Sequence, residues 1–319
     1  MALPALDREA RLIGLLDKAD KQLRAALMDA IAAAVGTHTL DDLEALLLAG
    51  RMEEALETAV RAGIVRFADE SAAVYTAAGQ SASAFLADAL EVTISFNQVN
   101  ERAVNFMQQE RLRLIREFSA EQRRATREAL VDGITRGANP REQAIAFRES
   151  IGLTRKQQRA VNNFRNMLED NDAEVFSRKL RDKRFDRKIR RAIQNDKPLT
   201  QDEISRMTTR YKDRYIKYRS EVIARTEALR AVHSGNNEGF EQAIENGDLD
   251  KDQLKKTWNT AGDDRVRDTH ELMDRQEVKW GEDFTSPSGS GLQYPGDPNA
   301  PGAETIQCRC VMTTRIDKL

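Results

Sequence analysis

The segment that decides the C-terminal fold runs from Trp258 to His270 and reads WNTAGDDRVRDTH. A second segment, Glu304–Ile316, begins ETIQCRC and contains both cysteines of the protein, Cys308 and Cys310. The loop between them, residues 281–303, holds four of the seven prolines. Most of the preceding chain instead has apolar residues at helical spacing. This contrast predicts a small α+β domain that follows a long helical region.

Working outward, the composition limits the classes of protein that fit. The chain has 319 residues, of which 32% are charged and only 6% aromatic, and its formal net charge is −2. The length suggests about two domains, and the composition is typical of helices with small Ala/Leu cores. Since the whole chain is not a polycation, any contact with DNA needs a local basic face.

The sequence also indicates where the protein is made. Two cysteines separated by one residue form no secreted disulfide framework and bridge poorly, which favours a reducing compartment. The N-terminus, MALPALDRE, lacks the pattern of a signal peptide. The most apolar stretch, residues 25–35, contains Asp29 and is too short to span a bilayer. We therefore expect a soluble protein, made in the cytoplasm, without membrane contact.

Helix-start signals divide the chain. The pattern predicts an N-terminal helical module over 1–91, a helical middle region over 92–200, and a long helix plus an α+β domain over 201–319. The fold class is therefore mostly α with a small C-terminal α+β domain. Cap residues or capping boxes are predicted at Thr39, Ser119, Asn139, Thr154 and Thr200.

Five blocks of the C-terminal region carry a family resemblance: Ile223–Arg230, Trp258–His270, Ser286–Gly289, Tyr294–Pro298 and Glu304–Cys310. In this order they resemble the C-terminal domain of the phage Mu F-like minor head proteins, also called phage head morphogenesis proteins. The resemblance is strongest over 219–316, weaker over 92–218, and absent from the first ninety residues.

The resemblance implies a structural protein and no enzyme: a minor head protein of a tailed phage that acts inside the capsid near the portal. It implies virion localisation and a portal protein as partner, with scaffold, major capsid protein or packaged DNA as further partners. The signature residues that it suggests are Arg225, Glu227, Trp258, Asp263, Arg265, Arg267, His270, Asp274, Glu304, Cys308 and Cys310. We expect Arg225 or Glu227 to hydrogen-bond to the C-terminal block.

Within this block, a helix capped by Asp263 would place Asp263, Arg267, His270 and Asp274 on one face. A strand through Cys308 and Cys310 would direct both sulfurs to one side. Thiolates and imidazole suit tetrahedral zinc, so His270, Cys308 and Cys310 are candidate ligands, with Asp263 or Asp274 as a fourth. Otherwise the sequence indicates no cofactor.

Two catalytic alternatives use the same residues. Asp263, His270 and Asp274 could form the acid/base site of a metal-dependent hydrolase or nuclease-like enzyme, with Arg265 or Arg267 steadying an anion. Cys308 could be a nucleophile. Because no catalytic motif supports either interpretation, we favour a structural role, in which these polar side chains tie down the long loop.

The most basic segment, residues 178–191, supports another alternative, a DNA-binding packaging factor. Its candidate phosphate-binding residues are Arg178, Lys179, Arg181, Lys183, Arg184, Arg187, Lys188, Arg190 and Arg191. The competing interpretation is a solvated helix face that pairs with its own acidic residues.

Overall fold

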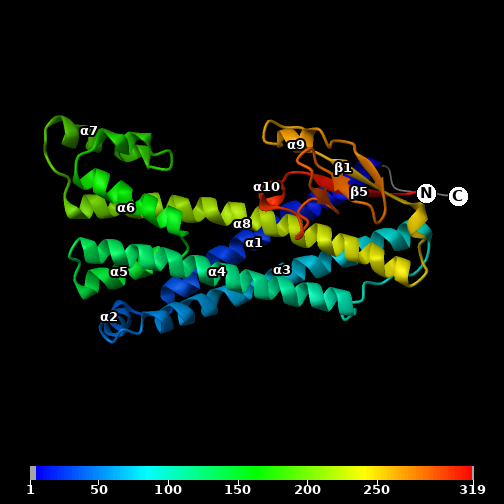
Figure 1. The fold of residues 1–319 in the computed structure, drawn as a ribbon, viewed down its shortest axis with the longest axis horizontal. Helices are drawn as coiled ribbons and strands as arrows, with labels where there is room; N and C mark the ends of the chain where they lie inside the picture. The colour runs from blue at the N-terminus through cyan, green and yellow to red at the C-terminus, as the bar shows by residue number, and fades with distance from the viewer. Residues whose placement is uncertain (1–4, 318–319) are drawn as a thin grey trace. The chain divides into compact units, whose positions relative to one another are not determined.

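The computed structural model describes residues 5–317, so the first four residues of the N-terminal segment examined for a signal peptide lie outside it. Its helices, drawn in Figure 1, are α1 (Ala5–Gly36), α2 (Leu40–Leu48), α3 (Met52–Leu90), α4 (Glu101–Thr135), α5 (Pro140–Ser150), α6 (Arg155–Glu169), η1 (Ala173–Ser177), η2 (Lys183–Phe185), α7 (Asp186–Gln194), α8 (Gln201–Glu245), η3 (Lys251–Gln253), α9 (Asp268–Glu271) and α10 (Gly302–Thr305). The strands are β1 (Leu254–Asn259), β2 (Glu277–Lys279), β3 (Phe284–Thr285), β4 (Gly291–Leu292) and β5 (Val311–Ile316). The predicted fold class, mostly α with a small C-terminal α+β part, is confirmed.

The chain forms two compact units, each built from separate stretches of sequence. The first contains the described residues up to 27, residues 67–112 and the chain from 221 onward. The second contains residues 28–66 and 113–220. The helices α1, α3, α4 and α8 each contribute to both units. The predicted division into 1–91, 92–200 and 201–319 stays a prediction.

In the first unit, β1 is the central strand of an antiparallel sheet with the order β2-β1-β5. Trp258 pairs with Met312 across β1 and β5, and Lys256 pairs with Val278 across β1 and β2. A separate hairpin, β3–β4, lies within the proline-containing loop. The loop therefore has regular structure of its own, as a long connection in a compact domain needs.

The sheet shares a hydrophobic core with helices of the same unit. Leu254 of β1 and Trp280 belong to one buried cluster with Phe85 of α3 and Phe240 of α8. Because this core comprises side chains from both the helices and the C-terminal segment, burying them holds the α+β part to its helical neighbours.

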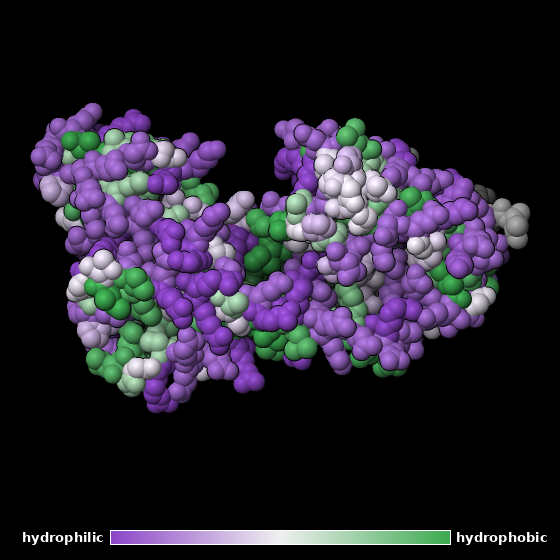
Figure 2. Space-filling view, in the orientation of Figure 1, coloured by the Kyte–Doolittle hydropathy of each residue, from purple (hydrophilic) through white to green (hydrophobic). Residues whose placement is uncertain are grey.

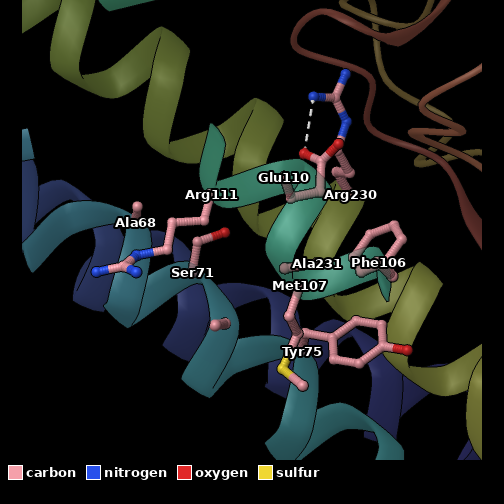
Figure 3. Close-up of a pocket in the computed structure, with 10 residues that line it drawn as sticks. Ala68, Ser71, Tyr75, Phe106, Met107, Glu110, Arg111, Arg230 and Ala231 are labelled. Carbon is pink, nitrogen blue, oxygen red and sulfur yellow. Dashed lines mark hydrogen bonds and ion pairs between the residues drawn. The ribbon is translucent and has the colours of Figure 1, made fainter. Parts of the chain in front are cut away.

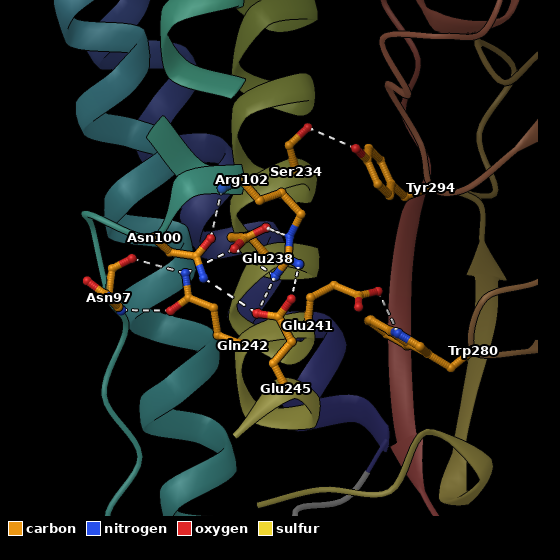
Figure 4. Close-up of polar contacts among 10 residues, drawn as sticks. All are labelled: Asn97, Asn100, Arg102, Ser234, Glu238, Glu241, Gln242, Glu245, Trp280 and Tyr294. Carbon is orange, nitrogen blue, oxygen red and sulfur yellow. Dashed lines mark hydrogen bonds and ion pairs between the residues drawn. The ribbon is translucent and has the colours of Figure 1, made fainter. Parts of the chain in front are cut away.

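Polar contacts reinforce the same unit (Figure 4). Arg102 of α4 pairs with Glu238 and Glu245 of α8, and the Nε–Oε2 distance to Glu238 is 2.7 Å. The main-chain N–H of Asn97 donates to the Gln242 side chain, and the indole of Trp280 donates to Glu241 at 2.8 Å. The helix α8 thus binds the segment before α4 and the start of α4 on one side, and Trp280 next to the C-terminal sheet on another.

In the second unit, one predicted helix start proved wrong. Ser119 lies inside the continuous helix α4, and its hydroxyl donates to the Ile115 carbonyl. Gln122 is 1% exposed, donates to the Ser150 carbonyl and accepts from the Gly152 N–H at 2.8 Å. The capping-box pattern fails here because its glutamine satisfies buried main-chain groups of another segment.

Four other predicted caps are confirmed. The side chains of Thr39, Asn139 and Thr154 each accept a hydrogen bond from the main-chain N–H of the third residue of the helix that follows. The side chain of that third residue in turn accepts from the N–H of the cap residue. Thr200 and Glu203 exchange the same two hydrogen bonds at the start of α8. These motifs act within four residues, so local sequence is sufficient to specify them.

Hydrophilic residues cover most of the visible surface in Figure 2, with hydrophobic areas between them. The most exposed large apolar side chains are Val99, Leu272 and Leu48. Within residues 5–317, no helix has the length and apolar character that crossing a membrane requires.

Candidate metal centre

A buried cluster of one histidine and two cysteines lies beside the central sheet. His270 comes from the short helix α9, while Cys308 and Cys310 lie in the extended segment between α10 and β5. His270 is 1% exposed, Cys308 0% and Cys310 1%. In the sequence Cys308 follows His270 by 38 positions, and only the fold brings the histidine and the cysteines together.

One nitrogen of the His270 ring faces both sulfurs. Its Nδ1 lies 3.5 Å from the Sγ of Cys308 and 3.5 Å from the Sγ of Cys310. The three potential ligand atoms all lie within 4.8 Å of one another. The backbone alternation predicted for Cys308–Cys310 places both sulfurs on one side, but strand β5 begins only at Val311.

The other ring nitrogen is held by a carboxylate. His270 Nε2 lies 2.8 Å from Oε2 of Glu304, a buried residue that is only 5% exposed. The second carboxylate oxygen accepts from the hydroxyls of Ser286 at 3.1 Å and Ser288 at 2.6 Å. Trp258 packs edge-on against the His270 ring, with centroids 5.2 Å apart and an interplanar angle of 80°. The ring orientation is thus fixed from three sides.

The cluster redistributes charge among its members. The hydrogen bond from Cys310 lowers the pKa of Cys308 well below its usual value; burial opposes this, and His270 reinforces it. The hydrogen bond to Cys308, together with burial, raises the pKa of Cys310. Burial disfavours protonated His270, but Cys308 and Glu304 outweigh it and raise the histidine's pKa. Of the two thiols, Cys308 is therefore the one that loses its proton more readily, next to a histidine whose protonated form it favours.

Trp258 supplies a further polar group to the cluster. Among the described residues its buried indole N–H has no oxygen or nitrogen acceptor at ordinary hydrogen-bond distance. Its dipole favours the thiolate form of Cys310 and so offsets part of the rise in the pKa of that thiol.

The two aspartates named as a fourth ligand lie elsewhere. Asp263 pairs with Arg309 at 2.8 Å and with Arg265 at 3.2 Å. Asp274 accepts from the N–H and hydroxyl of Thr260. Neither belongs to the group of ligand atoms around His270. The structure therefore does not bring together the proposed acid/base set of Asp263, His270 and Asp274.

The predicted helix from Asp263 to Asp274 was wrong, which explains this separation. The helix α9 begins only at Asp268, its N-cap is Arg267, and no side chain caps it. Asp263 instead closes a turn by accepting from the Arg265 N–H. Its carboxylate also binds the side chains of Arg265 in the same turn and of Arg309 on another segment, so it does not start a helix.

The remaining signature residues make structural contacts. Arg267 donates to the Ile306 carbonyl. This hydrogen bond joins the same two segments as the contact between His270 and Glu304. Arg225 lies 3.9 Å from Asp17, and Glu227 lies 3.6 Å from Arg230. Between them, Thr226 of α8 accepts from the Gln307 N–H at 3.1 Å. The expected hydrogen bond from Arg225 or Glu227 to the C-terminal block stays a prediction.

The sequence named Glu304 as a signature residue but did not predict its contact with His270. It also did not predict the hydrogen bonds that Ser286 and Ser288 donate to Glu304. The available signal was the Ser286–Gly289 block, which reads SPSG and occurs within the family resemblance. Its serines are small hydroxyl donors in a proline-containing turn, a composition that suits a carboxylate-binding loop.

The basic segment 178–191 has a different character. Arg184 binds Asp182, Arg181 binds Asp186, and Lys188 contacts Glu203. The hydrogen bond from Arg184 lowers the pKa of Asp182 to about 2. Arg178 lies beside the Met167 sulfur. Five exposed residues make no ion pair within the described part of the chain: Lys179, Lys183, Arg187, Arg190 and Arg191.

A small pocket between α3, α4 and α8 is unrelated to the cluster (Figure 3). It measures about 10 Å³, which is room for one water molecule. Tyr75, Phe106 and Met107 line its apolar side, and Arg230 lies 3.4 Å from Glu110 at its edge. A space this small does not accommodate an organic substrate.

Taken together, the fold and cluster define a helical protein that ends in a small α+β unit with a buried His-Cys-Cys group. Residues 183–313 match the family model described as Phage Mu protein F like protein. The predicted resemblance to the Mu F-like phage head morphogenesis family is thereby confirmed over this part of the chain, and it supports a role in head morphogenesis. Comparisons with curated proteins and with solved structures found no match.

Proposed function

We propose that this protein is a minor head protein of a tailed phage, a structural component that acts inside the head next to the portal. The match of residues 183–313 to the Mu F-like family carries the proposal. The match includes β1, β2, the loop hairpin and the first half of β5, and therefore the complete His-Cys-Cys cluster.

The buried cluster supports a structural rather than a catalytic role. All three of its side chains are at most 1% exposed, so a substrate cannot reach them in this conformation. We therefore expect no hydrolase or nuclease turnover, with or without divalent metal. A metal-dependent activity that disappears in His270→Gln, while His38→Gln retains it and both variants stay folded, would contradict this role.

The portal assignment is tested in assembled particles. Heads of the same phage are assembled with and without the portal protein, purified, and analysed for this chain by quantitative mass spectrometry. We expect the chain in portal-containing heads and a large reduction in portal-less heads. Equal amounts in both would show that the scaffold or the major capsid protein recruits it instead.

A second candidate activity is sequence-independent contact with packaged DNA. Its support is the group of exposed, unpaired basic side chains in 178–191, which phosphates could neutralise. The acidic residues Asp182, Asp186 and Glu203 already occupy three other basic residues of this segment. The candidate contact group is therefore smaller than the sequence predicted.

This activity is tested by duplex DNA binding at several salt concentrations. The variant replaces Lys179, Lys183, Arg187, Arg190 and Arg191 by glutamine. The control makes the same change at five exposed basic residues elsewhere: Lys18, Lys21, Arg61, Arg66 and Lys251. We expect only the first variant to lower the slope of log K against log salt, by about 0.9 for each phosphate that the protein no longer neutralises. Equal effects of both variants would mean that DNA binding depends on the net charge of the protein and not on residues 178–191.

A further inference from the structure

We propose that the chain binds one zinc ion through His270 Nδ1, Cys308 Sγ and Cys310 Sγ, as a structural metal centre. The proposal does not depend on where the protein acts in the head. It rests on the positions of the three ligand atoms, on the groups that hold them, and on their chemistry.

The spacing of the ligand atoms fits a tetrahedral ion. Zinc binds sulfur at about 2.3 Å and imidazole nitrogen at about 2.0–2.1 Å, so a tetrahedral angle separates the two atoms by about 3.5–3.6 Å. Both observed distances from His270 Nδ1, to Cys308 Sγ and to Cys310 Sγ, are 3.5 Å. The two sulfurs lie on one side of the extended segment, so the single intervening residue does not prevent chelation.

The surroundings match those of a metal-bound histidine. Such a histidine commonly donates its second ring N–H to a carboxylate, which fixes the tautomer and the ring orientation. Glu304 lies 2.8 Å from His270 Nε2 and is itself held by Ser286 and Ser288. The carboxylate therefore lies behind the histidine and is no ligand of the ion.

The donor set selects the metal. Two thiolates and one imidazole suit zinc, whereas magnesium and calcium require oxygen ligands. Zinc binding forms two Zn–S bonds and one Zn–N bond, and any proton remaining on the two thiols passes to solvent. With three protein donors in the described chain, the fourth position falls to a non-protein ligand such as water.

The ion would join segments that are far apart in the sequence. His270 lies on α9, before the long loop, and the cysteines lie after it, directly before β5. One bound ion therefore closes the loop across its base. Trp258 of β1 packs against the same histidine, which links the centre to the sheet.

The first test measures zinc in the full-length protein, purified under reducing conditions, by elemental analysis and native mass spectrometry. We expect about one zinc per chain in the wild type and its loss in Cys308→Ser/Cys310→Ser and in His270→Gln. His38→Gln, which changes a histidine outside the cluster, keeps the zinc. Cobalt in place of zinc adds a thiolate-to-cobalt absorption band that the cysteine variant lacks.

The positioning role of Glu304 is tested by chelator competition. Glu304→Gln is expected to weaken zinc binding about 10–100-fold, while Glu271→Gln, an exposed neighbour of His270, leaves it unchanged. If the cysteine variant fails to fold, metal uptake by the wild-type protein still tests the proposal. Folded wild-type protein that takes up neither zinc nor cobalt overturns the proposal, and so does zinc that persists in a folded cysteine variant.

Discussion

Gly235 of α8 lies against the main chain of α3, where an added Cβ would stand 2.1 Å from the carbonyl oxygen of Tyr75. Gly239, one turn later, meets Ala82 and the carbonyl of Gly79 in the same way. Within the first unit, glycines four residues apart allow these two helices to approach at a distance that any side chain would prevent.

Gly235→Ala is therefore expected to destabilise the protein by about 1–3 kcal/mol, because neither the main chain of α3 nor that of α8 can move freely. The control is Gly14→Ala in α1, where nothing lies within 4 Å of the added atom. That variant should be neutral or stabilise by about 0.5–1 kcal/mol. Urea unfolding of both variants checks the prediction, and equal stabilities would refute the close approach.

Gln122→Met is expected to cost about 1–3 kcal/mol in the second unit, because the Gly152 N–H is then buried without a partner and the Ser150 carbonyl keeps only the Leu153 N–H. Gln108→Met, on the exposed face of the same helix, should change stability by less than about 0.5 kcal/mol. The comparison uses chemical denaturation. A similar small effect at both positions would mean that water replaces the missing hydrogen bonds.

Arg102→Met should destabilise the first unit by about 1–3 kcal/mol, because Glu238 is 5% exposed at its side chain and would keep its charge with fewer partners. Arg111→Met breaks the exposed pair with Asp69, where both side chains are at least half exposed, and should cost less than about 1 kcal/mol. Thermal unfolding of the two variants measures the difference. The prediction fails if Arg111→Met is the more damaging change.

Lys256 makes stability depend on pH. Burial lowers its pKa from 10.5 to about 8, although Asp283, Asp297, Glu241 and Glu282 favour the charge. The penalty for burying the ammonium group is complete below pH 8, falls as pH rises because the unfolded chain then binds more protons, and vanishes above about pH 10.5.

Lys256→Met removes this penalty, so the stability of the wild type relative to the variant should rise by up to about 3 kcal/mol between pH 8 and pH 10.5. Urea unfolding at several pH values measures the difference. Lys279→Met, an exposed change on β2, is the control and should show no such trend. A constant difference for Lys256→Met would show that the amine stays solvated.

The comparison of sequence and structure separates local from distant signals. Asn139 and Thr154 predicted helix starts correctly, because a capping box is complete within four residues. Ser119 has the same pattern but lies inside α4, because Gln122 binds a distant segment. Asp263 failed as a cap for a similar reason, since Arg309, forty-six positions later, takes its carboxylate.

The sequence by itself determined the fold class, four helix starts and the residues with ligand chemistry, because periodicity, caps and side-chain type act over a few neighbouring positions. Only the tertiary structure decided which of those residues meet. It placed His270 between two sulfurs and Glu304, and left Asp263 and Asp274 outside the cluster. Such contacts join positions more than thirty residues apart, and the packing of the intervening loop decides them.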